Sequence, residues 1–132
     1  NQKFKFVVIS IGMNDITSGK SLIIFKKNLI KLEYILSKKF SVNYFIYSGM
    51  PPVHKLKTVP NPLKSILAIK ALIFDKFLRL KCERNINYIY ININKLSFEE
   101  NMVAKDGFHP SENFYKIWSE EISNIIKKEE NY

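Results

Sequence analysis

The sequence predicts an α/β protein built around a parallel β-sheet. Short apolar segments rich in β-branched residues alternate with longer segments in which apolar residues recur every three or four positions. The first pattern is typical of strands buried in a sheet, and the second is typical of amphipathic helices. Their order is strand, helix, strand, helix, strand, loop, helix, which favours parallel strands joined by helical crossovers. At 132 residues, the chain is expected to form a single domain, 1–132.

Three segments are predicted as strands. Residues 4–12, FKFVVISIG, form a nearly continuous apolar run that ends at Gly12, which predicts a strand buried on both faces. Residues 42–50, VNYFIYSGM, form the second strand, and residues 86–93, INYIYINI, form the third. Edge strands are usually protected by charge or proline, and the stretch VVISI has neither. We therefore expect the sheet to be incomplete in this chain, with further sheet preceding residue 1.

Three segments are predicted as helices. Residues 21–40 place one apolar face along Leu22, Phe25, Leu29, Leu32 and Leu36. In residues 62–84, Pro62 suits the first turn, and one apolar stripe consists of Ile66, Ile69, Ile73, Phe77 and Leu80. In residues 111–128, Ser111 is the predicted N-cap, and the apolar stripe consists of Phe114, Ile117, Trp118, Ile122 and Ile125.

The charge of the chain is uneven, and it narrows the classes of partner. The net charge is +9, with +12 in residues 1–84 and −3 in residues 85–132. The lysines are spaced as on solvated helix faces, and no RRM or zinc-finger pattern occurs, so we do not expect nucleic acid as a partner. An anionic membrane surface is a further candidate partner for the basic helices. The single Cys82 excludes an internal disulfide and is predicted to be a small core residue.

Polar residues follow each predicted strand and are expected to meet at one edge of the sheet. The carboxyl ends of parallel strands share an edge, which is where α/β proteins place their ligand sites. Asn14 follows the first strand and can donate its side-chain NH₂ to an oxyanion. Asp106 and His109 lie three residues apart in a turn after the third strand. This spacing lets the carboxylate bind Nδ1 of the imidazole and leaves Nε2 free to act as a base.

Two blocks of this sequence resemble the SGNH (GDSL-type) hydrolase family. VVISIGMND resembles the G-x-N-D block of that family, and DGFHPS resembles its D-x-x-H-P block at the start of the last helix. The resemblance covers essentially all 132 residues and implies a flavodoxin-like three-layer α/β/α fold. It also implies that His109 is the general base, Asp106 its orienting partner, Asn14 an oxyanion donor, and Gly12 the residue that lets the oxyanion loop approach.

The chain departs from the family at the nucleophile. Members carry a catalytic serine in an N-terminal G-D-S block, and neither G-D-S nor G-x-S-x-G occurs here. Ser10 is predicted to lie inside a strand, Ser48 precedes a turn, and Ser111 is read as a helix cap. We therefore expect this chain to be the C-terminal portion of the hydrolase domain. The serine would come from a missing N-terminal segment or a complementary chain.

The sequence thus predicts a serine ester hydrolase, a lipase or esterase, that is inactive as the isolated chain. The expected substrate is a small-molecule or lipid ester, and no metal or organic cofactor is implied. Residues 51–62, PPVHKLKTVPNP, are the predicted rim of the substrate site, with Met50, Pro51, Pro52 and His54 as its candidates. One alternative is a catalytically inactive scaffold or interaction domain. A nucleotide-binding flavodoxin-like domain is disfavoured, because no phosphate-binding glycine loop occurs.

Overall fold

A computed structural model describes residues 2–96 and 102–131 of the chain. Part of the polar loop predicted before the last helix, residues 97–101, lies outside the described residues. The strands are β1 (Phe6–Ile9), β2 (Tyr44–Ser48) and β3 (Tyr88–Ile91). The helices are α1 (Met13–Thr17), α2 (Leu22–Phe40), α3 (Leu63–Glu83) and α4 (Glu112–Glu130). Two short 3-10 helices, η1 (Val53–Lys55) and η2 (Ile93–Lys95), follow β2 and β3.

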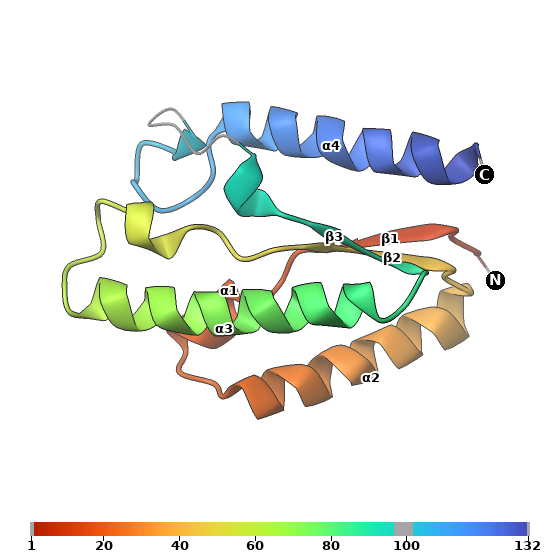
Figure 1. Ribbon diagram of the computed structural model, residues 1–132, viewed down its shortest axis with the longest axis horizontal. Helices are drawn as coiled ribbons and strands as arrows, with labels where there is room; N and C mark the ends of the chain where they lie inside the picture. The colour runs from red at the N-terminus through yellow and green to blue at the C-terminus, as the bar shows by residue number, and fades with distance from the viewer. Residues whose placement is uncertain (1, 97–101, 132) are drawn as a thin grey trace.

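The three strands form a parallel sheet in the order β1-β2-β3, as the alternating pattern predicted. In the register of the sheet, Val8 pairs with Ile46, and Ile46 pairs with Ile89. The helices α2 and α3 cover one face of the sheet, and α4 covers the other (Figure 1). The predicted α/β/α layering with a parallel sheet of three strands is therefore confirmed. Within the described residues, no helix has both the length and the apolar character needed to cross a bilayer.

The strands are shorter than the sequence predicted, and the central one is β2. Ile46 and Tyr47 of β2 are fully buried, whereas Val8 of β1 is 38% exposed at the edge of the sheet. The prediction that residues 4–12 are buried on both faces is therefore wrong for this sheet. Residues 10–12 leave the sheet early because the backbone turns at Gly12, whose φ of 120° ends the extended conformation.

Two apolar layers hold the helices on the sheet. The predicted stripes of α2 and α4 face it: Phe25, Leu29 and Phe114 are buried. In α3 the predicted stripe is wrong, since Ile66, Ile69 and Ile73 are exposed. The residues of α3 that pack on the sheet are Leu67, Ala71, Phe74, Leu78 and Cys82. Cys82 is buried as predicted, and burial raises the pKa of its thiol to about 12.

A buried polar cluster joins α2, α3 and the sheet. The carboxylate of Glu33 accepts hydrogen bonds from the hydroxyls of Tyr47 and Tyr88 and lies 3.0 Å from Nζ of Lys81. Glu33 is 7% exposed and Tyr47 is fully buried. Burial and the hydrogen bond to Glu33 raise the pKa of Tyr47, so this hydroxyl stays a donor.

Replacing Glu33 with alanine is expected to lower the free energy of unfolding by about 3 kcal/mol. The substitution removes the acceptor of a buried tyrosine hydroxyl and leaves the Lys81 ammonium without its partner. Urea denaturation would measure the loss. The matched control is Glu83→Ala. The Glu83 side chain is 59% exposed, and its ion pair with Arg79 is long at 3.9 Å and also exposed. The control should change stability by less than about 0.5 kcal/mol, and equal losses in the two variants would contradict the role given to the cluster.

Candidate active site

The candidate site lies at the carboxyl edge of the sheet, where the loops after the three strands meet. Ser10 and Asn14 follow β1, Pro51 follows β2, and His109 precedes α4. All four residues line one cavity of about 280 Å³ and also an adjoining open cavity of about 500 Å³. The structure therefore brings together the three loops that the sequence placed at one edge.

His109 and Asp106 form a close pair in this site. Nδ1 of His109 lies 2.6 Å from Oδ2 of Asp106. The other carboxylate oxygen, Oδ1, accepts backbone N–H bonds from Phe108 at 2.9 Å and from His109 at 3.0 Å. These contacts, the Phe108 N–H first and the imidazole second, lower the pKa of Asp106 from 3.8 to about 2. Asp106 is thus ionised at neutral pH and able to stabilise an imidazolium at position 109.

The loop that carries Asp106 and His109 is stabilised by backbone hydrogen bonds between its two ends. The N–H of Ala104 donates to the carbonyl of His109 at 2.8 Å, and the N–H of Ser111 donates to the carbonyl of Met102 at 2.9 Å. Ser111 then caps α4, as predicted, because its Oγ accepts from the N–H of Phe114 at 3.2 Å. The backbone of His109 is therefore fixed between these loop bonds and the first turn of α4.

Nε2 of His109, the ring nitrogen that does not contact Asp106, has an unused hydrogen-bonding position among the described residues. Within residues 2–96 and 102–131, no hydrogen bond is made to this nitrogen, and the side chain is 71% exposed. Because Nδ1 faces the carboxylate, the pair favours the tautomer in which Nδ1 carries the proton and Nε2 accepts one. The arrangement can accept a proton from a hydroxyl that enters the cavity.

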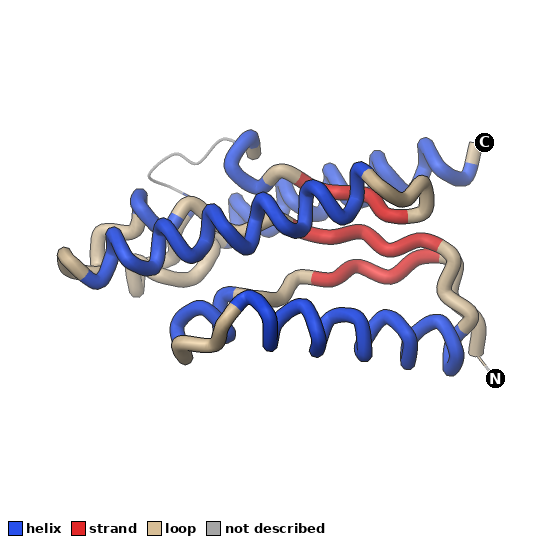
Figure 2. Tube along the Cα trace, turned by 60° about the horizontal axis from the view of Figure 1, so that its bottom comes forward, coloured by secondary structure: helices blue, strands red, loops and turns tan. Residues whose placement is uncertain are grey.

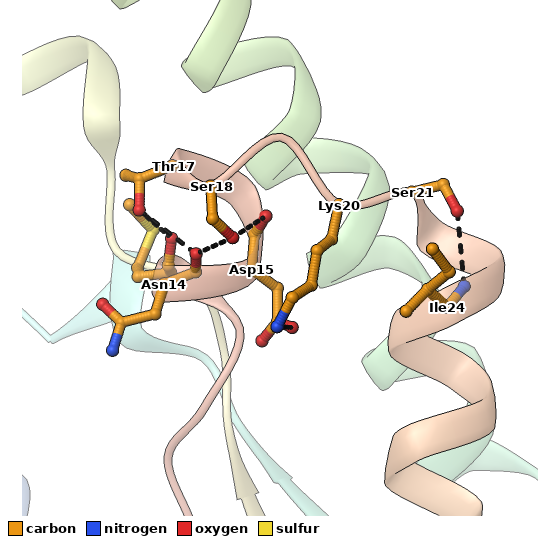
Figure 3. Close-up of polar contacts among 8 residues, drawn as sticks. Asn14, Asp15, Thr17, Ser18, Lys20, Ser21 and Ile24 are labelled. Atoms are coloured by element: carbon orange, nitrogen blue, oxygen red, sulfur yellow. Dashed lines mark hydrogen bonds and ion pairs between the residues drawn. The ribbon is translucent and has the colours of Figure 1, made fainter.

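Asn14 lines the same cavity from the first turn of α1. Figure 3 shows the side chain extending away from Thr17 and Ser18, whose hydroxyls donate to the backbone carbonyl of Asn14 and not to its side chain. In the described part of the chain, the amide has no hydrogen-bond partner. The neighbouring carboxylate of Asp15 is different, since it pairs with Lys20 at 3.1 Å. Asn14 is thus free to donate, whereas Asp15 stabilises the turn into α2.

Gly12 closely approaches the loop after β2. With φ at 120°, it adopts a conformation that side chains rarely tolerate, and a Cβ there would clash with Cε of Met50. The position of Met50 is fixed by α3, because the Met50 N–H donates to Oδ1 of Asp75 at 2.8 Å. The Met50 side chain is also buried. The loop after β1 therefore rests directly on the loop after β2.

The predicted substrate rim divides into two parts. Pro51 lines both cavities that contain His109, and Met50 lines the open one of about 500 Å³. Pro52 and His54 line only a neighbouring pocket of about 300 Å³ between η1 and α3, which Met50 and Pro51 also line. The structure thus brings only Met50 and Pro51 to the candidate site, because the chain turns away at η1.

Two site residues were missed by sequence reasoning. Ser10 is exposed at the cavity, not inside a strand as predicted, because β1 ends at Ile9. Trp118 lines the cavity, and its Nε1 donates to Oγ of Ser48 at 3.0 Å. The apolar stripe of the last helix included Trp118, but its spacing carried no sign of this bond. Among the described residues, no group of three or more His, Cys, Asp or Glu side chains could hold a metal ion.

A methyl group at position 107 is expected to destabilise the loop that carries Asp106 and His109. Gly107 has φ at 70°, and a Cβ would clash with Cγ2 of Thr58, whose Oγ1 donates to the carbonyl of Gly107 at 2.9 Å. Gly107→Ala should lower the free energy of unfolding by about 1–2 kcal/mol for the backbone conformation and further for the clash. Thermal unfolding would measure both parts.

The control for this substitution is Gly19→Ala. Gly19 has φ at 77°, but a Cβ there would meet nothing within 4 Å, so only the backbone part of the cost applies. Combining Gly107→Ala with Thr58→Ser removes the clashing methyl group and should abolish the difference between the two glycine variants. A Gly107 variant no less stable than the Gly19 variant would contradict the clash.

The fold and the site together define an α/β protein with a histidine–carboxylate pair at the edge of a parallel sheet. Comparison with known protein families matches residues 1–122 to the family described as GDSL-like Lipase/Acylhydrolase. Because the match spans most of the chain, the chain belongs to this family. No match was found among curated proteins or among solved structures. The family resemblance read from the G-x-N-D and D-x-x-H-P blocks is therefore confirmed.

Proposed function

We propose that the chain supplies the base, its orienting acid and an oxyanion donor of a serine ester hydrolase. The substrate is a small-molecule or lipid ester, and the nucleophilic serine lies outside these 132 residues. The observation that carries the proposal is the 2.6 Å contact between Asp106 and Nδ1 of His109, which leaves Nε2 unpaired among the described residues, in a side chain that lines the same cavity as Asn14.

Each residue then has a defined part in the reaction. The serine Oγ attacks the ester carbonyl carbon while Nε2 of His109 accepts its proton, and Asp106 stabilises the imidazolium that forms. The amide of Asn14 donates to the oxyanion of the tetrahedral intermediate. His109 then protonates the departing alcohol, which leaves an acyl-serine. Water attacks the acyl-serine with the same base, releasing the acid and regenerating the serine.

The two serines that line the cavity do not match this role well. Ser48 is 3% exposed, and its Oγ already accepts a hydrogen bond from Trp118. Ser10 is exposed, but it lies in the extended segment before Gly12 and outside any G-D-S block. These features support a nucleophile that comes from an upstream segment of the same protein or from a complementary chain.

The test is hydrolysis of p-nitrophenyl esters by the chain alone and by the chain combined with a segment that carries a G-D-S block. We expect the combined protein to hydrolyse the ester and the isolated chain to give no turnover above background. Turnover by the isolated chain that is lost in Ser10→Ala or Ser48→Ala would contradict the external nucleophile.

A catalytically inactive interaction domain is the second candidate. The observation that favours it is the 71% exposure of the His109 side chain, because a base that works in a closed site is better shielded from water. Reaction of the combined protein with a fluorophosphonate separates the two functions. A hydrolase would be labelled, and an interaction domain would not.

A further inference from the structure

The helix α3 carries a second apolar stripe on the side away from the sheet. Ile66, Ile69 and Ile73 of this stripe are 53%, 59% and 49% exposed. On α2, Ile23 and Ile30 are 78% and 59% exposed. We call these five isoleucines, with the groove between the two helices, the α2–α3 face. Exposed apolar residues gathered on one surface mark an interaction site more often than scattered ones do.

The groove between α2 and α3 is apolar at its base and basic at its rim. It encloses about 840 Å³, and Leu22, Phe77 and Leu80 line it together with Lys26, Lys76 and Arg84. Nζ of Lys26 lies 4.8 Å from the centre of the Phe77 ring. No carboxylate occurs among the described residues that line the groove. Lys81 also lines the groove and pairs with Glu33, but no carboxylate in the described part of the lining neutralises Lys26, Lys76 or Arg84.

The charge is polarised across the sheet. The helices α2 and α3 hold ten lysines and arginines against three acidic residues, Glu33, Asp75 and Glu83. Glu33 and Asp75 are engaged internally, by tyrosine hydroxyls in both cases. On the opposite face, α4 carries three lysines against five glutamates. Figure 2 shows α2 and α3 turned toward the viewer, with α4 behind the sheet.

We propose that the α2–α3 face docks on the surface of an anionic lipid bilayer. Lysine and arginine side chains would contact the lipid phosphates, and the isoleucines would enter the boundary between headgroups and acyl chains. A second copy of the chain is a poorer occupant, because two such faces would bring like charges together. Nucleic acid would use the cations but leave the exposed isoleucines unsatisfied.

This surface is placed to present the candidate site to the membrane. The first residues of α3 lie at the same end of the molecule as the loops that form the site (Figure 1). Ile66 and Ile69 are in this half of the helix. The proposal does not depend on catalysis, so loss of docking and loss of ester hydrolysis would be recognised separately.

The experiment is co-sedimentation of the chain with vesicles of phosphatidylcholine alone or with 30% phosphatidylglycerol. We expect binding to the anionic vesicles, weakened strongly between about 0.05 M and 0.5 M salt, and little binding to the neutral ones. Lys76→Gln with Arg84→Gln should weaken binding about 25-fold, at about fivefold for each charge. The matched control removes two lysines from the opposite face, Lys127→Gln with Lys128→Gln, and should change binding less than about threefold.

A second variant separates apolar insertion from charge. Ile69→Ser with Ile73→Ser changes only exposed side chains, so the fold should persist by circular dichroism, and binding should weaken about tenfold or more. Equal binding to neutral vesicles, equal losses in the two charge variants, or an unchanged isoleucine variant would each overturn the proposal. So would self-association through this face in sedimentation, or tighter binding to a DNA duplex than to the vesicles.

Discussion

Replacing His109 with glutamine is expected to lower kcat of the hydrolase, assembled with its nucleophile segment, by about 10⁵- to 10⁶-fold. The reason is that Nε2 of His109 is the only proposed proton acceptor at the cavity. Glutamine keeps a polar side chain of similar length but cannot take the serine proton. KM should change little, because the substitution removes a contact made in the transition state rather than a binding surface. Steady-state hydrolysis of a p-nitrophenyl ester measures both constants.

The chain offers a matched control for this substitution in its other histidine. His54 is exposed in η1 and lines a neighbouring pocket, not either of the two cavities that contain His109. His54→Gln should therefore keep kcat within about twofold of the parent protein. If His109→Gln retained a tenth of the activity, or if both variants lost it equally, His109 could not be the base.

Replacing Asp106 with asparagine is expected to lower kcat by about 10⁴-fold while leaving the fold intact. An asparagine amide can present its NH₂ to Nδ1 and so favour the wrong tautomer, and it cannot stabilise the imidazolium. Asp15→Asn is the control, because it removes the same charge from the other loop of the site. Asp15 pairs with Lys20, so its loss should change kcat less than about threefold.

Asp106→Asn is also expected to change how stability depends on pH in the acidic range. The contacts to Asp106 lower its pKa from 3.8 to about 2 in the folded chain. A depressed carboxyl pKa contributes stability above pH 4, and this contribution is lost as the pH falls through about 2. Urea denaturation between pH 6 and pH 2.5 should show a smaller fall in stability for Asp106→Asn than for the parent chain. An unchanged pH dependence would contradict the contacts described for the carboxylate.

The fold class and the meeting of the site loops could be predicted from the sequence because both depend on local patterns. Short apolar runs rich in β-branched residues identified the strands, and residues directly after parallel strands must share an edge of the sheet. The pairing of Asp106 with His109 was likewise encoded in a three-residue spacing. The structure places both side chains as that spacing predicted.

The orientation of α3 could not be predicted in the same way. This helix has two apolar stripes of similar spacing, one through Ile66 and Ile73 and one through Leu67 and Phe74. Periodicity alone does not tell which stripe faces the sheet. The position of Ser10 was missed for a related reason, since apolar residues continue past the end of β1. Contacts such as Thr58 with Gly107 join residues 49 positions apart, and no local signal announces them.

The most direct test of the account is to map where a fluorophosphonate reacts in the assembled protein. Mass spectrometry after digestion would identify the labelled serine, and the His109→Gln variant would show whether labelling depends on the base. The account predicts a single modified serine outside residues 1–132, with labelling abolished in the variant. Modification of Ser10 or Ser48, or labelling that persists without His109, would contradict it.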